Sequence, residues 1–245
     1  MNVFFAGYRK WAFAIAKGLV ETKSSKWHLT GTLSPNSTEA DFSALPIPSW
    51  TIDPTQMHTL DMLHKIAAEK PDVILFYGWS WMIPKEIYNT YLCLILHPSP
   101  LPKYRGGSPL QHQIINGEKI SAVTILQVTD GLDAGAIYSQ TLFSLSGTLQ
   151  QIFSRIEKTG LNDTKKVLDG ISDNTLTPFL QDDSSATVFR RRKPEDSEIT
   201  NEALQKKTGE ELYNFIRALS DPYPNAYIVG NDNKKVYIKS AALEE

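Results

Sequence analysis

A histidine and an aspartate each follow an apolar run of the sequence, and together they could transfer a proton. His97 ends the run 92–96, and Asp133 lies in the loop after the run 122–128. An imidazole titrates near neutral pH and can take a proton from an attacking amine, while a carboxylate can fix its tautomer and stabilise the imidazolium. If both runs are strands that end at one edge of a sheet, the two side chains could meet in a cleft. Such a pair is ordinary by itself and does not establish a function.

The segment after His97 is predicted to be a stiff loop at the mouth of a binding site. Three prolines within residues 98–102 fix φ and remove backbone donors, so neither a strand nor a helix can continue there. In an open parallel sheet, ligands bind in the crevice beyond the carboxyl ends of the strands. Ser108 is then predicted to cap a helix that has Pro109 at its first position.

Apolar patterning predicts that strands and helices alternate along most of the chain. Strands are expected at residues 2–6, 28–33, 73–76, 92–96, 122–128 and 137–143, and helices at residues 11–20, 60–67, 109–116 and 148–169. Such alternation is typical of a sheet covered by helices. The sequence therefore predicts an α/β fold with a largely parallel sheet.

The composition changes at the polar stretch 181–186, which predicts a boundary in the chain. Residues 1–183 are expected to form a catalytic domain, and residues 184–245 a small C-terminal subdomain. A capping box of Thr208 and Glu211 announces a helix in this second part. It is followed by two short apolar runs that are predicted to pair as a β-hairpin, at residues 226–229 and 235–240.

The overall composition is that of a globular protein. With 245 residues, 41% of them hydrophobic, and a formal charge of -2, the chain can bury a substantial core and offers no electrostatic argument for non-specific binding of nucleic acid.

Arg9 and Lys10 interrupt the first apolar run, which argues against a signal peptide, and no other segment approaches the ~18 apolar residues of a membrane span. The single cysteine, Cys93, allows neither an internal disulfide nor a cysteine metal cluster. We expect a cytoplasmic protein without a metal.

Two further loops contain residues that could bind a ligand. Residues 77–84 combine a glycine turn with aromatic and apolar side chains, which could form a slot for a flat heteroaromatic ring or equally a hydrophobic plug over the sheet. Arg9 and Lys10 lie in the first loop between a strand and a helix, where they could meet a phosphate or simply be solvated cations.

Three segments closely resemble the formyltransferase fold of folate-dependent enzymes: residues 97–109 (HPSPLPKYRGGSP), 123–125 and 130–135 (DGLDAG). Residues 191–196, 216–219 and 222–226 resemble the C-terminal parts of the sugar N-formyltransferases in that superfamily, so the resemblance covers nearly the whole chain. It implies a Rossmann-like formyltransferase fold, followed by a small subdomain made of a helix and a β-hairpin.

The resemblance also implies a reaction and a set of site residues. The formyl donor would be N10-formyltetrahydrofolate and the acceptor a primary amine, with His97 transferring the proton and Asp133 as its partner. The amine would attack the formyl carbon, an oxyanion would form, and the proton would pass by way of His97 to the departing folate nitrogen. Residues placed around the pteridine are Tyr77, Gly78, Trp79, Trp81, Met82, Ile83, Asp130 and Gly131.

One position departs from the family pattern. The family has an asparagine two positions before the histidine, where its amide helps to hold the formyl oxygen, and this chain has Ile95 there. Isoleucine cannot donate a hydrogen bond, and the loss of one oxyanion donor typically costs about 2.7–4 kcal/mol. Our hypothesis is that Gln111, His112 or Gln113 supplies the missing donor. The alternative is that these are ordinary helix residues that face solvent or a subunit surface.

The C-terminal resemblance implies a small acceptor, namely a nucleotide-linked 4-amino-4,6-dideoxy sugar used in glycan biosynthesis. A short C-terminal part and a net negative charge favour this over an RNA acceptor, so neither nucleic acid nor a membrane is expected as a partner. Candidates for the pyrophosphate are Arg9, Lys10 and Arg105, and candidates for packing against base or sugar are Tyr104 and Tyr223. The alternatives are a methionyl-tRNA formyltransferase-like enzyme, or a catalytically silent folate- or nucleotide-sugar-binding protein because of Ile95. A homodimer stays open.

Overall fold

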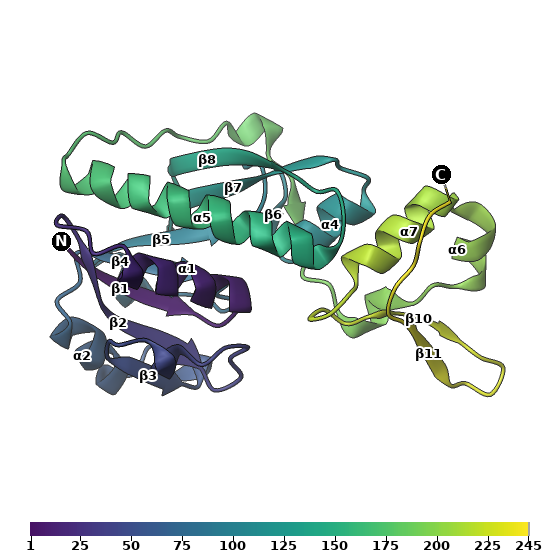
Figure 1. Ribbon diagram of the computed structural model, residues 1–245, viewed down its shortest axis with the longest axis horizontal. Coiled ribbons are helices and arrows are strands. Elements are labelled where there is room, and N and C mark those ends of the chain that lie inside the picture. The colour runs from purple at the N-terminus through teal and green to yellow at the C-terminus, as the bar shows by residue number, and fades with distance from the viewer. Residues whose placement is uncertain (245) are drawn as a thin grey trace.

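A seven-stranded sheet is the centre of the computed structural model, which describes residues 1–244 (Figure 1). The strand order is β3-β2-β1-β4-β5-β7-β8, with β3 to β5 parallel and β7 and β8 antiparallel to their neighbours. The strands are β1 (Asn2–Gly7), β2 (His28–Pro35), β3 (Ser49–Ile52), β4 (Val73–Tyr77), β5 (Leu92–His97), β7 (Ile120–Gln127) and β8 (Ile137–Ser144). The predicted α/β fold with a mostly parallel sheet is confirmed.

Helices cover both faces of this sheet, because successive side chains of each buried strand point to opposite sides. Val3 and Phe5 of β1 pack in one cluster with α1 (Lys10–Glu21) and α5 (Leu149–Ser172). The neighbouring residues of β1 pack in a second cluster with α2 (Leu60–Ala68) and α3 (Lys85–Tyr88). The helix α4 (Pro109–Ile115) lies beyond the end of β5. Among residues 1–244, no helix is both long enough and apolar enough to span a membrane.

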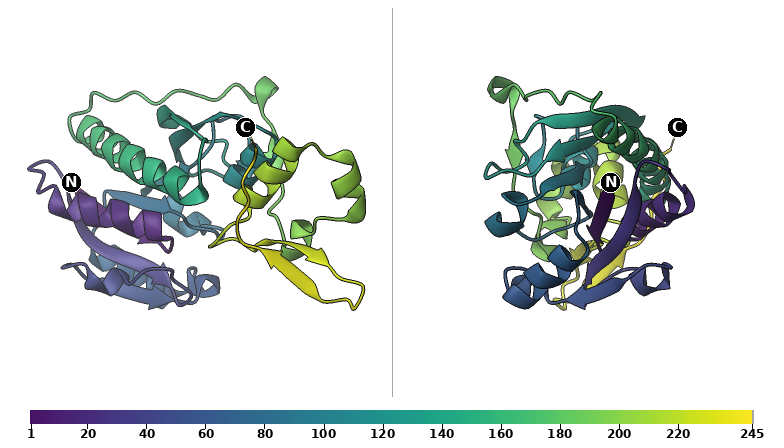
Figure 2. Two further views of the ribbon diagram at one scale, coloured as in Figure 1. Left: turned by 45° about the vertical axis from the view of Figure 1, so that its right-hand side comes forward. Right: turned by 90° about the vertical axis from the view of Figure 1, so that its left-hand side faces the viewer.

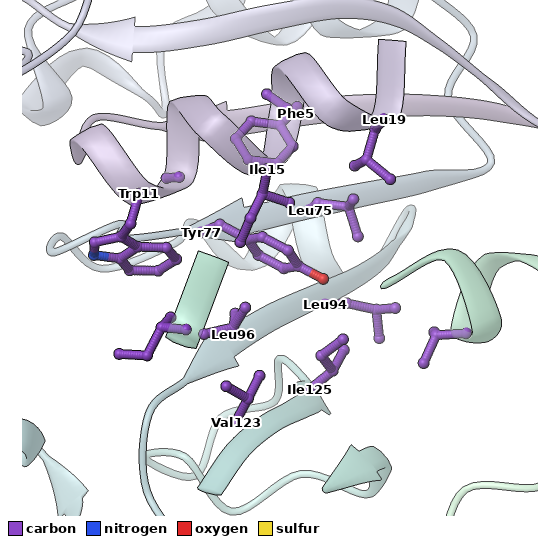
Figure 3. Packing of buried hydrophobic residues seen from close by; sticks show 14 of the residues in the cluster. Phe5, Trp11, Ile15, Leu19, Leu75, Tyr77, Leu94, Leu96, Val123 and Ile125 are labelled. Carbon is purple, nitrogen blue, oxygen red and sulfur yellow. The ribbon is translucent and has the colours of Figure 1, made fainter. Parts of the chain in front are cut away.

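Tyr77 is part of the first cluster and not of a ligand-binding loop. Figure 3 shows its ring among buried side chains such as Ile15, Leu75 and Leu94. Its hydroxyl forms a 2.8 Å hydrogen bond with the hydroxyl of Thr164, and burial raises the pKa of Tyr77. The expectation that Tyr77 binds the pteridine is wrong for its side chain, because the alternation of β4 turns it toward α1 and α5.

The C-terminal part contains the predicted helix and hairpin and one unpredicted helix. Its elements are β9 (Val188–Phe189), α6 (Asn201–Lys206), α7 (Gly209–Ala218), β10 (Ala226–Val229) and β11 (Lys235–Ile238). The capping box of Thr208 and Glu211 at the start of α7 is present, as is the hairpin. A small cluster around Ile199, Leu219 and Ala226 gives α6, α7, β10 and β11 a core of their own. These four elements lie together at one end of the molecule (Figure 2), whereas β9 pairs with β6.

The segment that leads into the C-terminal part, residues 188–191, packs against the loop after β5. The strand β6 (Arg105–Gly106) pairs in parallel with β9. Gly107 lies so close to Arg191 that a Cβ atom there would be 2.4 Å from the Arg191 Cα. A division of the chain at residue 183 stays a prediction, and the residues that follow it help to shape the site.

Candidate active site

His97 ends β5 with both ring nitrogens engaged. Its Nε2 lies 2.8 Å from the carbonyl oxygen of Tyr104. A carbonyl oxygen only accepts hydrogen bonds, so Nε2 carries the ring proton of the neutral imidazole and Nδ1 carries the lone pair. Nδ1 lies 3.5 Å from Oδ2 of Asp133, and both side chains are largely buried. His97 can therefore accept a proton at Nδ1.

Asp133 is held in place by the backbone of the loop after β5. Its Oδ2 accepts a 2.8 Å hydrogen bond from the backbone N–H of Gly106, and Gln181 donates to its carbonyl oxygen. The carboxylate faces Nδ1, so a proton that arrives there would be stabilised by an opposite charge. The structure thus brings together the two residues that the sequence pairs.

The route by which Asp133 reaches His97 differs from the expected one. The strand β7 is antiparallel to β5, and Gln127, at its end, pairs with Leu94 and not with the end of β5. The carboxyl ends of β5 and β7 therefore do not share an edge. The loop 128–136 carries the carboxylate back to His97, so the proximity was expected for a wrong topological reason.

Two grooves meet beside this pair. The large groove has a volume of about 560 Å³ and is lined by residues 81–85, Tyr88, Ile95 and residues 126–133. The small groove has a volume of about 220 Å³ and is lined by Arg9, Trp11, residues 78–80, 95–98 and 106–111, Arg191, Arg192, Tyr223 and Pro224. Asp133 lines the large groove, His97 lines the small one, and Ile95 lines both.

The large groove has a mostly apolar lining and one polar corner. Trp81, Met82 and Ile83 contribute apolar surface, and the Met82 side chain is 84% exposed. At the corner, the hydroxyl of Tyr88 donates a 2.6 Å hydrogen bond to Asp130, and Lys85 lies 3.0 Å from the same carboxylate oxygen. The hydrogen bond from Tyr88, together with Lys85, lowers the pKa of Asp130. Of the residues predicted around the pteridine, those in this groove are Trp81, Met82, Ile83, Asp130 and Gly131, while Gly78 and Trp79 line the small groove.

The small groove is cationic. Arg9, Arg191 and Arg192 line it, and no carboxylate does so among residues 1–244. Arg9 pairs with Glu39 and lies over the ring of Tyr223, at 5.5 Å from its centroid. Burial raises the pKa of Tyr223 to about 12, so its hydroxyl stays neutral. Arg191 is exposed and donates to the carbonyl of Ser80, which leaves further N–H groups free for a ligand.

Three of the predicted acceptor-binding side chains lie elsewhere. The guanidinium of Arg105 is buried and donates to Gln181 and Asp183, so it is not free to bind a phosphate. The ring of Tyr104 stacks on Phe189, its hydroxyl donates to Glu118, and only its carbonyl serves the site.

Lys10 lines a separate groove beside Glu157. Contacts distant in sequence thus engage the side chains of Arg105 and Tyr104, and none of the three side chains lies free in the small groove.

Of the three proposed stand-ins for the family asparagine, the structure leaves one. The amide nitrogen of Gln113 donates to the carbonyls of Pro98 and Pro109, and the side chain is fully buried. The Nε2 of His112 donates to the carbonyl of Arg190, and its ring packs on Phe189. Gln111 lines the small groove.

Some residues of the small groove were not predicted to bind a ligand. Arg191 and Arg192 belong to a run of cations whose density was visible in the sequence, but no local signal says which of them faces a site. Ser108 does not cap α4 with its side chain, because its backbone is left-handed (φ 55°) and its hydroxyl accepts from the N–H of Arg192.

Among residues 1–244, no cluster of three or more His, Cys, Asp or Glu side chains is placed to hold a metal.

The sequence model of the family described as "Formyl transferase" matches residues 9–162, more than half of the chain. This chain belongs to the formyl transferase family. A methionyl-tRNA formyltransferase from Bacillus cytotoxicus is 32% identical over 200 residues, which are 80% of this chain and 61% of that protein. The chain thus spans about three fifths of the length of the curated relatives that it matches.

Two solved structures with this fold cover the whole chain. The methionyl-tRNA formyltransferase from Clostridium thermocellum is 30% identical with a TM-score of 0.77, and the match covers 100% of this chain and 94% of that one. A sugar N-formyltransferase from a Shewanella species is 20% identical with a TM-score of 0.80, and the match covers 100% of this chain and 99% of that one. The second likeness is one of fold alone.

Proposed function

We propose that this protein transfers a formyl group from N10-formyltetrahydrofolate to the amine of a nucleotide-linked 4-amino-4,6-dideoxy sugar. The observation that carries the proposal is the pair of His97 and Asp133 at the junction of two grooves. A donor in the large groove and an acceptor in the small groove would place the formyl carbon and the amine side by side at Ile95. Holding two substrates side by side in a reactive geometry accelerates the reaction between them, because the entropy of bringing them together is lost on binding.

The lining of the large groove suits a folate. Trp81, Met82 and Ile83 can pack against the faces of a flat heteroaromatic ring, and the exposed backbone of residues 126–133 offers N–H and C=O groups to its edge. Membership of the formyl transferase family supports the same donor.

In the proposed reaction, the neutral amine attacks the formyl carbon and the electrons of the C=O double bond move to the oxygen. Nδ1 of His97 takes the amine proton, since Nε2 already donates to the Tyr104 carbonyl. Asp133 then faces the imidazolium and stabilises it. The bond from the formyl carbon to the folate nitrogen breaks as that nitrogen receives the proton, and the products are a formamide and tetrahydrofolate.

The charge of the small groove supports an acceptor that carries phosphate. Three guanidinium groups line a groove of about 220 Å³, and Arg191 is the most exposed of them. Guanidinium binds phosphate oxygens with two parallel N–H groups, so a pyrophosphate is a suitable partner. Tyr223 and Pro224 add a surface on which a sugar can pack.

A methionyl-tRNA acceptor is the second candidate, because the relatives at 30–32% identity carry that name. Phosphates of tRNA would also be attracted by the guanidinium groups of the small groove. Salt should weaken the binding of tRNA more than the binding of a nucleotide sugar, because each phosphate of a nucleic acid that the protein neutralises adds to the salt dependence.

The test is an assay of the purified protein with N10-formyltetrahydrofolate and two acceptor sets. The first set contains nucleotide-linked 4-amino-4,6-dideoxy sugars with several bases, and the second contains methionyl-tRNA; mass spectrometry detects the formylated product. Transfer to a nucleotide sugar supports the proposal, and transfer to methionyl-tRNA alone replaces it with the second candidate. Binding of both substrates without transfer to any acceptor would indicate a silent binding protein.

A further inference from the structure

We propose that the side-chain amide of Gln111 donates a hydrogen bond to the formyl oxygen as negative charge develops on it. The inference rests on the proposed formyl transfer and adds a catalytic residue to it. It concerns one atom, the amide nitrogen, and one step, the attack of the amine on the formyl carbon.

The need for a donor follows from the chemistry. When the C–N bond to the acceptor forms, the carbonyl electron pair moves to oxygen, and a donor must meet that charge in a site that excludes water. His97 cannot serve, because its Nε2–H is directed to the Tyr104 carbonyl and its Nδ1 must take the amine proton. Ile95, which lines both grooves at their junction, has only a hydrocarbon side chain.

Most other donors of the small groove are engaged, enclosed or assigned to the acceptor. Arg191 keeps N–H groups for a ligand, and we assign these to the phosphate of the acceptor. Arg9 pairs with Glu39, and the hydroxyl of Ser80 is hydrogen-bonded to that of Tyr8. The indole N–H of Trp79 has no partner, but it is fully enclosed, so no ligand atom can contact it.

Gln111 differs from all of these. Its side chain is 4% exposed, and its amide has no hydrogen-bond partner among residues 1–244. The amide oxygen of Gln113 is sealed from solvent, whereas the amide of Gln111 is not. Water can satisfy this amide in the free protein, and the oxygen of a ligand that enters the small groove can take the place of that water.

The helix α4 is held next to the end of β5. Gln113 lies on the opposite face of this helix from Gln111 and donates to the carbonyl of Pro98, the residue that follows His97. Leu110 and Ile114 of the same helix pack in the cluster that includes Leu96. The helix is thereby fastened next to His97, and Gln111 lines the same groove as His97 and Ile95.

The decisive variant is Gln111→Met, which keeps the length of the side chain and removes the amide. We expect kcat to fall about 10²–10³-fold, the usual effect of losing one oxyanion donor, while KM for each substrate changes little. Titration with tetrahydrofolate and a thermal unfolding curve report whether the groove and the fold are intact. Gln205→Met, on the exposed surface of α6, is the matched control and should retain full activity.

A second variant tests whether the hydrogen-bond donor, and not another property of Gln111, is what supports kcat. Ile95→Asn places an amide at the junction of the grooves, and in the Gln111→Met background it should restore kcat by at least about tenfold. A loss of kcat that Ile95→Asn partly reverses supports the inference. A Gln111→Met protein that binds tetrahydrofolate and keeps kcat within about threefold of the parent overturns it.

These outcomes are separate from failure of the proposed function. If the unmodified protein transfers formyl to no amine acceptor, the proposed function fails before any variant is compared. If it does transfer formyl and the loss in Gln111→Met appears in KM alone, the proposed function stands and Gln111 is a binding residue, which contradicts the inference.

Discussion

The two grooves that meet at Ile95 differ in size, in charge and in the part of the chain that builds them. The large groove has an apolar lining from residues 81–133, entirely inside the stretch that matches the family. The small groove is less than half that volume, is cationic, and takes Arg191, Arg192 and Tyr223 from beyond that stretch.

This difference separates two tasks. If the large groove binds the formyl donor, the donor site lies entirely within the stretch that matches the family. Acceptor choice can then change at Arg191, Arg192 and Tyr223, none of which lines the large groove. The expected variants therefore fall into three groups. Changes at His97, Asp133 and Gln111 should lower kcat, changes at the arginines of the small groove should raise KM for the acceptor, and changes in the large groove should raise KM for the donor.

The largest effect is expected at the junction. His97→Gln keeps a donor for the Tyr104 carbonyl but removes the base, so kcat should fall about 10²–10⁴-fold. KM for both substrates should change little, as steady-state kinetics will show. Asp133→Asn should lose kcat as well, because its amide cannot stabilise the imidazolium. A His97→Gln protein with normal kcat would remove His97 from the chemistry.

The small groove should show the next largest effect. Arg191→Met removes an exposed guanidinium, and hydrogen bonds to charged groups are worth about 1.5–3 kcal/mol, so KM for the acceptor should rise about 10–100-fold. KM for the donor should stay constant. Lys158→Met, on the exposed face of α5, removes the same charge at a distance and should leave both constants unchanged. Equal rises for both substrates would contradict the separation of the grooves.

A smaller effect is expected in the large groove. Met82 is 84% exposed in the free protein, so Met82→Ser should leave stability unchanged. If the donor covers this side chain, partial loss of its apolar burial costs about 1 kcal/mol and raises KM for the donor about fivefold. Leu180→Ser is the control, since Leu180 is 85% exposed and lines neither groove. An unchanged donor KM in Met82→Ser would place the donor elsewhere.

The smallest kinetic effect is expected for Tyr77, which packs in the core. Tyr77→Phe removes the hydrogen bond to Thr164, so the free energy of unfolding should fall by about 1 kcal/mol. Thr164 still donates to the carbonyl of Gly160, which limits the cost. Denaturant unfolding measures this change, and kcat and both KM values should match the parent. A raised donor KM at unchanged stability would return Tyr77 to the ligand site.

Much of this molecule could be predicted from local sequence. Apolar periodicity indicated the main strands and helices, and the capping box of Thr208 and Glu211 marked the start of α7. The strand β3 was not predicted, because its short, proline-flanked sequence has no clear apolar pattern. It forms a strand by pairing with β2. The pairing of His97 with Asp133 was expected, although the antiparallel β7 made the stated reason wrong.

The sequence by itself determined which chemical groups are available and which segments become strands or helices, since side-chain type and periodicity are local properties. Only the tertiary structure decided which polar side chains are free. Gln113 is engaged by Pro98, and Arg105 by Gln181 and Asp183, while Gln111 and Arg191 face a groove. A buried polar group takes whichever partner the fold brings within reach, and those partners lie far away along the chain.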